Sequence, residues 1–475
     1  MAFTISSDAV ADLEVVALPN DASFIKYDQN QISWLAQSGS GTPSDGNIKL
    51  EEIVLIAEVS DGGGYLILTL SQGEQDGEEP FRLSSFLARS LPQELLDHYL
   101  LKRAPTALKT GPETSLDVII SVRSGTGHGQ PQKFYDAVLQ PLLKILGVGQ
   151  GSYGIVFTRD ANTVREYARE RWGHQGHAKP GETSKKETVI LLSGDGGVVD
   201  LLNGSTEPST SATLPTIALI PLGTGNALFH SLHKPHYARA DPPAPSHLVL
   251  ALQALLQGRP AALPTFQASF SDGSHLVEES SGSSAAITQL TGAIVASYGF
   301  HSQLVWESDT PAYRKHGAKR FGMVAQELVK EGHAYSATVE TGRSSRLSTT
   351  RFNYILATLV SNLEKAFTIS PHSKPLDGQL RLVHFGDVSG EKTMEIMMAA
   401  YNNGSHVGLK WTTEDGEEQG VGYEAVDEIK VTTLEEDARW RKVCIDGTIV
   451  EIPQGGSMTV KKSLQPKLQV LVLDA

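Results

Sequence analysis

The pattern that most restricts the fold is a repeated order of short apolar run, glycine turn and helix between residues 114 and 262. Four apolar runs have the length and borders of strands: 118–120, 154–157, 189–192 and 216–220. Helical segments are expected between and after them, at 131–146, 163–171, 198–202 and 246–257. Strands that alternate with helices are typical of a parallel sheet covered on both faces. The pattern therefore predicts a three-layer α/β domain.

The regions on either side of this domain are predicted to be β-rich. Residues 1–107 contain apolar runs at 53–57 and 65–68 and one expected helix at 92–101. Further strand candidates follow residue 263: 287–296, 352–361, 380–385, 442–452 and 468–473. We therefore expect a small β-rich extension at 1–107, an α/β domain at 114–262 and a mostly antiparallel, sandwich-like lipid-binding domain at 263–475. The length of 475 residues suits two or three such cores.

Composition narrows the classes of partner. The net charge of -14 argues against a general nucleic-acid binder, which would normally be basic. The single cysteine, Cys444, excludes an intrachain disulfide and a multi-cysteine zinc site, which favours a reduced, intracellular protein. No apolar stretch is long enough to cross a bilayer, the first residues lack a secretory pattern, and Ala2 excludes N-myristoylation. We expect a cytoplasmic protein that visits the membrane surface peripherally and binds no nucleic acid.

Two polar segments interrupt the α/β pattern and are predicted to be surface loops, 174–186 and 205–211. His174 and His177 could suggest a metal pair. A solvated loop is the better interpretation, because no further ligands with metal spacing accompany them. The segment 313–320 is unusually basic for an acidic chain and lies in a region expected to be helical, 309–332.

Glycine-rich turns follow three of the predicted strands. They are 124–127 (Ser-Gly-Thr-Gly), 193–197 (Ser-Gly-Asp-Gly-Gly) and 223–226 (Gly-Thr-Gly-Asn). Glycine lets backbone N–H groups approach a phosphate closely, and the carboxyl ends of parallel strands meet at one edge of a sheet. One such turn is weak evidence, but three after successive strands predict a phosphate site. The chain has no Gly-Lys-Ser/Thr element, so the site is not a P-loop.

The second turn places a carboxylate, Asp195, between glycines. A negative charge beside phosphates is unfavourable unless it has a function. Asp195 could bind Mg²⁺ through its oxygens or accept the proton of an attacking hydroxyl. The alternative is a turn aspartate that bonds to its own backbone. The three neighbouring turns favour a functional Asp195.

The ordered motifs resemble those of the diacylglycerol kinase and sphingosine kinase superfamily. The segment 193–204 is similar to one family signature and 221–226 to a second. A set of short motifs resembles the sphingosine kinase branch in particular: Ser193, Gly299-Phe300, Glu307-Ser308, Tyr313-Arg314-Lys315 and Arg320-Phe321. The segment 158–162 resembles the family's short stretch near adenine, and Asp446-Gly447 its late Asp-Gly-Glu motif. The resemblance runs in order from about residue 114 to 454.

This resemblance implies an α/β nucleotide domain followed by a β-rich domain, with transfer of the γ-phosphate of ATP to a lipid hydroxyl in the presence of Mg²⁺. Asp195 would be the general base, and Gln303 would lie at the lipid head group. The residues implied near the nucleotide are Ser121, Val122, Arg123, Thr158, Asn162, Ser193, Gly194, Gly196, Asp200, Gly223, Thr224, Gly225, Arg314, Arg320, Asp446, Gly447 and Thr448. Arg314 and Arg320 would clamp phosphates, the alternative being a solvated basic helix face. The metal ligands stay unassigned.

The chain departs from the family's motifs at several positions. Ser121-Val122 stands where Asn-Pro is usual, Gly197 replaces Thr or Leu, and Thr163-Val164 replaces His-Ala. Gln303 stands where sphingosine kinases have an aspartate, and an amide cannot pair with a charged amine. Thr448 replaces Glu in the late motif. Sphingoid bases become less expected, while ceramide-like and glycerolipid acceptors stay open.

Three hypotheses therefore remain: an active lipid kinase, a degenerate kinase that binds lipid or nucleotide without turnover, and a soluble-substrate kinase. The last stays open because NAD kinases share the Gly-Asp-Gly turn, but the motifs from Gly299 to Phe321 favour a lipid kinase. The pocket beside Asp195 should discriminate between acceptors. A deep apolar tunnel would indicate a lipid tail, and a polar cleft would indicate a soluble substrate.

Overall fold

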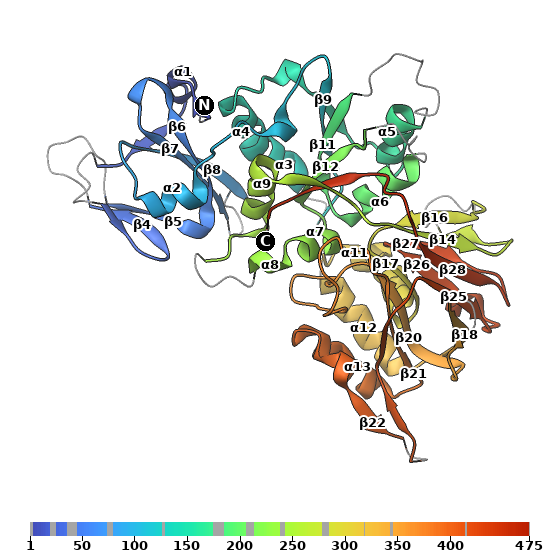
Figure 1. Ribbon diagram of the computed structural model, residues 1–475. Coiled ribbons are helices and arrows are strands. Elements are labelled where there is room, and N and C mark those ends of the chain that lie inside the picture. The colour runs from blue at the N-terminus through green and yellow to red at the C-terminus, as the bar shows by residue number, and fades with distance from the viewer. Residues whose placement is uncertain are drawn as a thin grey trace.

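The computed structural model describes most of the chain, and it divides into a β-rich N-terminal unit, an α/β domain and a second β-rich domain (Figure 1). The described residues are 3–19, 25–35, 45–73, 79–125, 129–173, 185–205, 213–237, 243–277, 285–317, 319–342, 345–413 and 416–474. The predicted loops 174–186 and 205–211, including His174 and His177, lie outside this set except for their ends.

The α/β domain is built on a six-stranded sheet in the order β10-β9-β11-β12-β29-β13. Its central parallel strands are the predicted ones: β9 (Thr114–Ile120), β10 (Gly154–Phe157), β11 (Lys186–Ser193) and β12 (Thr216–Pro221). Both faces of β9 are buried, since Val118 packs with Leu142 and Leu252 while Ile119 packs with Val164 and Leu201. Burial on both faces explains why these strands are apolar without alternation.

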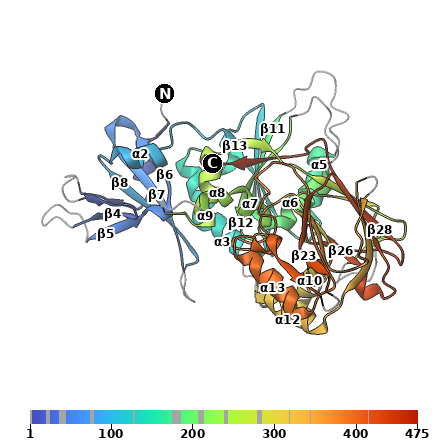
Figure 2. The same cartoon turned by 60° about the horizontal axis from the view of Figure 1, so that its bottom comes forward.

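Helices cover both faces of this sheet, which confirms the predicted three layers (Figure 2). One layer holds α5 (Thr163–Trp172) and α6 (Asp195–Gly204). The other holds α9 (His247–Gln257) and a continuous helical run made of α3 (Gln130–Phe134), a π-helical turn (Tyr135–Leu139) and α4 (Gln140–Ile145). Ser246 caps α9 by accepting a hydrogen bond from the Val249 N–H, as its sequence position predicts.

The strand β29 (Gln469–Val472) lies elsewhere than expected. The sequence analysis placed it in the second domain, but it pairs in parallel with β12 and antiparallel with β13 (Arg259–Ala262) in the α/β sheet. Leu471 packs into the core on one face and Val470 into the core on the other. A strand with two apolar faces is stable only where both faces are covered, and the helix-covered sheet offers that place.

The second β-rich domain is a large antiparallel assembly whose main path runs β15-β27-β26-β17-β20-β18-β25-β28-β14-β16. Its strands are β14 (Phe266–Phe270), β15 (His275–Leu276), β16 (Gln289–Gly292), β17 (Val295–Gly299), β18 (Tyr335–Thr341), β19 (Ser345–Arg346), β20 (Arg351–Thr358), β21 (Arg381–Gly386), β24 (Gly422–Ala425), β25 (Glu428–Thr433), β26 (Lys442–Ile445), β27 (Thr448–Glu451) and β28 (Ser457–Lys462). The predicted strands 287–296 and 442–452 are each broken in two, and both breaks lie at the candidate site.

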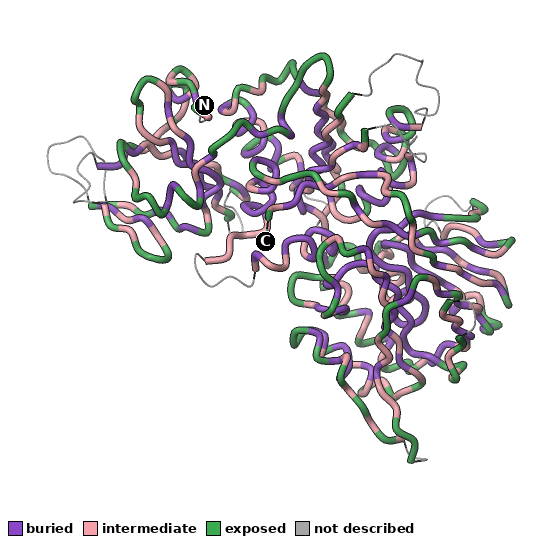
Figure 3. Tube along the Cα trace, in the orientation of Figure 1, coloured by how far each residue is buried: buried purple, intermediate pink, exposed green. Residues whose placement is uncertain are grey.

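Helices on this domain are α10 (Phe300–Ser308), α11 (Pro311–Arg314), α12 (Lys319–Glu331) and α13 (Gly390–Tyr401). A separate hairpin joins β22 (Lys410–Thr412) to β23 (Glu418–Gly420). The tube in Figure 3 shows buried segments running through the strands, with exposed segments at the outer turns. No helix of the described residues is long and apolar enough to span a membrane.

The N-terminal unit is β-rich, as predicted. A five-stranded sheet contains β1 (Thr4–Ile5), β2 (Val15–Ala17), β6 (Ile53–Val59), β7 (Tyr65–Gln72) and β8 (Phe81–Ala88). A smaller sheet contains β3 (Ile25–Tyr27), β4 (Gln31–Trp34) and β5 (Gly46–Lys49). Two helices complete the unit, α1 (Ser7–Ala11) and α2 (Gln93–Tyr99), the latter at the predicted position.

The buried position of β29 makes a testable prediction about stability. We expect Leu471→Ala to lower the free energy of unfolding by about 2–5 kcal/mol, because it leaves a cavity between two covered faces. Leu464→Ala is the matched control, since Leu464 is 95% exposed in the same C-terminal segment. Denaturant unfolding of both variants measures the difference. Equal, small effects would show that β29 is not part of the core.

Candidate active site

The turns after β11 and β12 lie in direct backbone contact. The Leu222 N–H donates to the Ser193 carbonyl at 3.2 Å, and the Asp195 N–H donates to the Gly225 carbonyl at 3.0 Å. A Cβ atom added at Gly223 would lie only 2.2 Å from the Gly194 Cα. Glycine is therefore required here by the contact between the two turns, in addition to any approach of a ligand.

The first turn joins the other two. The Thr224 hydroxyl donates to the Gly125 carbonyl at 3.2 Å, and the hydroxyls of Ser124 and Ser193 are 3.4 Å apart. Gly125 has a positive φ of 75°, which favours glycine. The rest of this turn, Thr126 and Gly127, lies outside the described residues. The structure thus brings the described parts of all three turns together at one edge of the sheet.

The residues before and beside the first turn are held by the same edge. The Ser121 N–H donates to the Leu192 carbonyl at 3.0 Å, and the Val122 N–H donates to the Thr158 hydroxyl at 3.1 Å. Arg123 follows directly and is exposed. Binding of a nucleotide by these residues stays a prediction.

Asp195 is the first residue of α6, and its carboxylate reaches the start of α7 (Ala227–Leu232). One carboxylate oxygen accepts the Ala227 N–H at 2.6 Å and the other accepts the Leu228 N–H at 3.1 Å. Asp195 therefore does not bond to the backbone of its own turn, which was the alternative interpretation. Burial raises the pKa of Asp195 to about 6, against the two N–H donors that favour the anion.

A second carboxylate, Asp446, comes from the other domain. It sits at φ 47° in the hairpin between β26 and β27, followed by Gly447 and Thr448. Its oxygens accept the backbone N–H groups of Ala293, Ile294 and Val295 at 2.6, 3.0 and 2.6 Å.

Burial raises the pKa of Asp446 to about 7, against these three donors, and the negative charge of Asp195 raises it further. The two carboxylates are therefore close enough to interact, one from each domain. The break between β16 and β17 is the bend whose N–H groups Asp446 binds.

Asp200 and Asn162 lie in the layer formed by α5 and α6. The Asp200 carboxylate on α6 lies 3.4 Å from the Arg165 guanidinium on α5, and burial, opposed by Arg165, raises the pKa of Asp200 to about 6. The Asn162 N–H donates to Asp160 at 3.0 Å at the start of α5. Thr163, one of the departures from the family pattern, braces this turn by accepting the Arg159 N–H at 3.1 Å.

The predicted phosphate clamp is organised around an acid that sequence reasoning missed. Arg314 donates to both oxygens of Asp309, at 3.1 and 2.5 Å, and Arg320 lies 3.3 Å from the same carboxylate. Burial lowers the pKa of Arg320, as does the charge of Arg314, while Asp309 opposes this shift. The two guanidinium groups are thus held together by one counter-charge. Ala318, between them in sequence, lies outside the described residues.

Gln303 is fully buried on α10, and its amide is already engaged. Its N–H donates to Glu307 at 2.6 Å, and the same Glu307 oxygen accepts from Arg439 at 3.0 Å. The residue proposed for the lipid head group therefore forms part of an internal Gln-Glu-Arg chain.

The departure at Gly197 is explained by its packing against Ser193. A Cβ atom added at Gly197 would lie 2.7 Å from the Ser193 hydroxyl oxygen. The larger residue at 193 thus occupies the space that a larger residue at 197 would need. Gly196, between them, has no atom within 4 Å of an added Cβ and faces open space.

Asn226 is a further residue that sequence reasoning left without a role. Its side chain donates to the Gly223 carbonyl at 2.8 Å and accepts the Gly223 N–H at 3.3 Å, which fixes the shape of the third turn. Its position at the end of a Gly-Thr-Gly-Asn turn is a usable signal, because asparagine commonly braces turns in this way. Asp309 gave no such signal, since it is spaced irregularly from both arginines.

A small apolar pocket lies behind the two carboxylates, between α7 and the second domain. Its lining includes Leu228, Leu232, Ala293 and Val360, with Lys374 among the few polar members, and its volume is about 20 Å³. Leu228 and Ala293 are the residues whose N–H groups bind Asp195 and Asp446.

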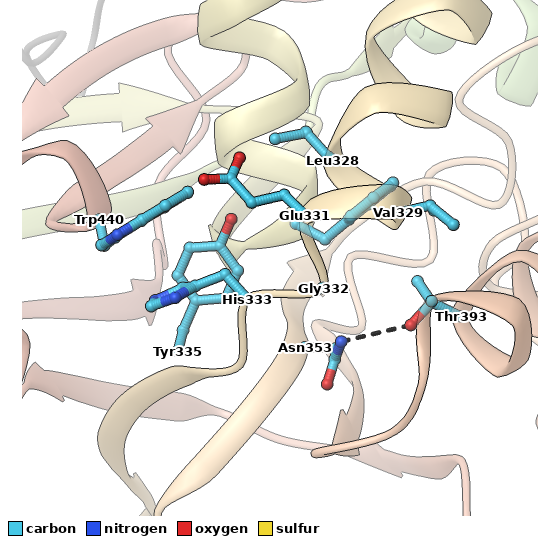
Figure 4. A pocket seen from close by; sticks show the side chains of 11 residues that line it. Leu328, Val329, Glu331, Gly332, His333, Tyr335, Asn353, Thr393 and Trp440 are labelled. Atoms are coloured by element: carbon cyan, nitrogen blue, oxygen red, sulfur yellow. Dashed lines mark hydrogen bonds between the residues drawn. The ribbon is translucent and has the colours of Figure 1, made fainter.

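A second, smaller pocket of about 10 Å³ lies between α12, α13 and β20, and none of the predicted site residues lines it (Figure 4). His333 stacks on Trp440 at 4.1 Å on one side, and Asn353 bonds to Thr393 on the other.

The acidic residues do not by themselves make a metal cage. In the part of the chain that the structure describes, no three His, Cys, Asp or Glu side chains are grouped to hold a metal ion. Both Asp195 and Asp446 already accept backbone donors. Mg²⁺ commonly binds through one or two carboxylates together with substrate phosphates, so these side chains are compatible with an ion that arrives with ATP.

The contact between the glycine turns makes the next prediction. We expect Gly223→Ala to lower the free energy of unfolding by about 1–3 kcal/mol, because its methyl group would overlap Gly194. Gly196→Ala should leave stability unchanged or raise it by up to about 1 kcal/mol, since alanine suits the first turn of a helix better. Thermal unfolding and ATP titration of both variants test this.

ATP binding should weaken in both variants, in Gly223→Ala because the turns separate and in Gly196→Ala because the open side faces the phosphates. If Gly196→Ala binds ATP as tightly as the wild type, the phosphates do not lie beside Gly196.

Comparisons with known proteins agree with the site's place in the chain. Residues 116–266 match the model of the family described as "Diacylglycerol kinase catalytic domain". A comparison with curated proteins finds no match.

Three solved structures are similar. A candidate diacylglycerol kinase from Bacillus anthracis str. Sterne has 15% identity and a TM-score of 0.48, covering 77% of this chain and 99% of that chain. A diacylglycerol kinase from the same strain has 14% identity and a TM-score of 0.44, covering 77% and 98%. Yeast NADH kinase complexed with NADH has 10% identity and a TM-score of 0.35, covering 85% and 89%.

The family match covers residues 116–266, which hold nearly all of the α/β domain and all three turns. This match supports the prediction of a kinase that uses a nucleotide. The match does not single out the sphingosine kinase branch.

Proposed function

We propose that the protein is an ATP-dependent lipid kinase that phosphorylates a lipid hydroxyl, with Asp195 as the general base. One observation carries the proposal. The Asp195 carboxylate is held by two backbone N–H groups at the meeting point of three glycine turns, inside the segment that matches a kinase catalytic family. A fixed carboxylate with a pKa of about 6 is suited to accept a proton near neutral pH.

In this mechanism the hydroxyl oxygen attacks the γ-phosphorus of ATP while its proton passes to Asp195. The bond from that phosphorus to the β–γ bridging oxygen breaks, and ADP leaves with the electron pair. The Ala227 and Leu228 N–H groups orient the carboxylate. Arg314 and Arg320 would stabilise the transferred charge. Mg²⁺, bound with ATP, would neutralise phosphate charge.

A pocket near Asp195 is lined mainly by apolar side chains, among them Leu228, Leu232, Ala293 and Val360, with Ser231, Ser361 and Lys374 as polar members. This lining is compatible with the hydrocarbon of a lipid acceptor, but it is not the deep apolar tunnel that would single one out. At about 20 Å³ the pocket takes only a small group, so most of the acceptor would lie outside it. An acceptor of this kind resides in a bilayer, so the protein would act at a membrane surface from the cytoplasm.

The engagement of Gln303 with Glu307 favours acceptors without a positive charge next to the hydroxyl. A neutral amide tied into an internal chain offers no counter-charge to an ammonium group. We therefore rank diacylglycerol and ceramide above free sphingoid bases.

A degenerate kinase that binds lipid or nucleotide without turnover is the second candidate. The observation that favours it is the saturation of both Asp195 oxygens by backbone donors, together with Thr448 in the late motif.

Purified protein with labelled ATP, Mg²⁺ and a panel of diacylglycerol, ceramide, sphingosine and NAD separates these functions. Phosphorylated diacylglycerol or ceramide supports the proposal. ATP binding without any labelled product supports the degenerate kinase, and labelled NADP alone supports a soluble-substrate kinase.

The role of Asp195 is tested by Asp195→Asn. We expect kcat to fall by about 10²–10⁴-fold, because the amide cannot accept the proton. The amide has the size of the carboxylate, but its NH₂ group faces one of the two backbone N–H donors. Asp117→Asn is the control, since Asp117 is a buried aspartate of the same domain, paired with Arg171 at 2.5 Å and away from the turns. Both variants should lose some stability, so rates are compared at a temperature where both are folded. Equal activity in the two variants would show that Asp195 is not the general base.

The pKa of Asp195 predicts the pH profile. A base with a pKa of about 6 is mostly protonated at pH 5 and mostly ionised at pH 7. The rate of transfer should therefore rise about tenfold from pH 5 to pH 7 and then level off. The measurement is kcat/KM across this range with unfolding monitored in parallel. A midpoint near 4, the ordinary value of an aspartate, would show that the pKa of Asp195 is not raised in the working enzyme.

A further inference from the structure

The sheet of the N-terminal unit is apolar on both faces. On β7, Leu66 and Leu68 belong to the core that also contains Leu142 and Leu252 of the catalytic domain. Ile67, between them, belongs to a separate core inside the N-terminal unit. A sheet with two apolar faces needs a covering layer on each. The covering layer on the first face is supplied by helices of the α/β domain.

Direct contacts join the two parts. The ring of Phe81 on β8 packs edge-on against Phe134 of α3, with centroids 5.1 Å apart, and both rings are buried. The Gln253 side chain on α9 donates to the Ile53 carbonyl at 2.9 Å. Figure 1 shows the sheet of the N-terminal unit beside α3 and α9. The N-terminal unit thus shares one continuous core with the catalytic helices.

Phe134 lies at the end of the short helix that leaves the first glycine turn. The helical run begins at Gln130, directly after Gly129 at φ 68°, and continues through the π-helical turn into α4. The turn itself is tied to Thr224 through the Gly125 carbonyl. Gly125 is held at the sheet edge and Gly129 begins this run, so the packing of Phe134 bears on the position of Gly129 on the far side of the turn.

We propose that the described residues between 3 and 107 are a fixed part of the catalytic body and that Phe81 is a positioning residue, which through Phe134 holds the start of the helix that follows the first phosphate turn. The proposal rests on the proposed function only in that the turn binds ATP. It assigns a role to the N-terminal unit that its sequence alone does not suggest.

The test compares two substitutions on one strand of the full-length chain. Phe81→Ala removes the ring that faces Phe134. Phe86→Ala removes a ring on the opposite face of β8, where Phe86 packs against Trp34 with centroids 5.9 Å apart. Both changes leave a cavity, so both should lower the unfolding temperature. We expect the dissociation constant of ATP to rise about tenfold in Phe81→Ala and to stay within about twofold of the wild type in Phe86→Ala.

ATP affinity is measured by equilibrium titration without any lipid. A folded Phe81→Ala variant that binds ATP as tightly as Phe86→Ala overturns the proposal. Should Phe81→Ala fail to fold, Phe81→Leu and Phe86→Leu replace the pair. A weaker ATP affinity in Phe81→Leu alone supports the proposal, and equal affinities overturn it.

The two proposals fail in different ways. If the wild-type protein binds ATP but phosphorylates no lipid, the lipid kinase function is ruled out. The role of Phe81 is then decided by the ATP affinities of Phe81→Ala and Phe86→Ala. Wild-type protein that binds no ATP overturns both.

Discussion

The backbone contact between Gly194 and Gly223 is the constraint on which the rest of the site depends. It brings two neighbouring turns so close that no side chain fits between them, and this closeness lets the Asp195 carboxylate reach the first N–H groups of α7. A helix N-terminus carries partial positive charge, which stabilises an anion. Burial opposes this and prevails, since the pKa of Asp195 rises to about 6. The turn geometry therefore supplies both the position of the carboxylate and its affinity for a proton.

The two domains meet through a similar arrangement on the other side. Asp446 gathers three backbone N–H groups of the bend at 293–295, and Asn203 of α6 bonds to both the N–H and the carbonyl of Thr291, just before that bend. The return of β29 into the α/β sheet adds a covalent tie. These links hold Asp446 near Asp195 while leaving only a small apolar pocket behind them. An acceptor chain longer than a few atoms must then approach from outside this pocket or widen it.

The elements and the meeting of the turns could be predicted from sequence because both depend on local signals. Apolar runs with glycine at their ends identify β11 and β12, and parallel strands bring their ends to one edge. The position of β29 could not be predicted, because its three apolar residues fit either sheet and only the long-range pairing decides. The bonding of Gln303 to Glu307 was missed for a similar reason. A motif gives the place of a side chain along a helix but not the partner that its atoms choose.

Charge balance bears on how ATP would enter this site. Asp195 and Asp446 place two acids at the glycine turns, and Arg314 and Arg320 are already neutralised in part by Asp309. Phosphate oxygens entering between the two guanidinium groups would have to share them with that carboxylate. This competition would weaken ATP binding in the absence of a cation, because the unshielded acids would repel the triphosphate. A divalent ion bound with ATP would relieve that repulsion at Asp195 and Asp446, so nucleotide affinity should depend more steeply on the ion than in a site lined by arginine alone.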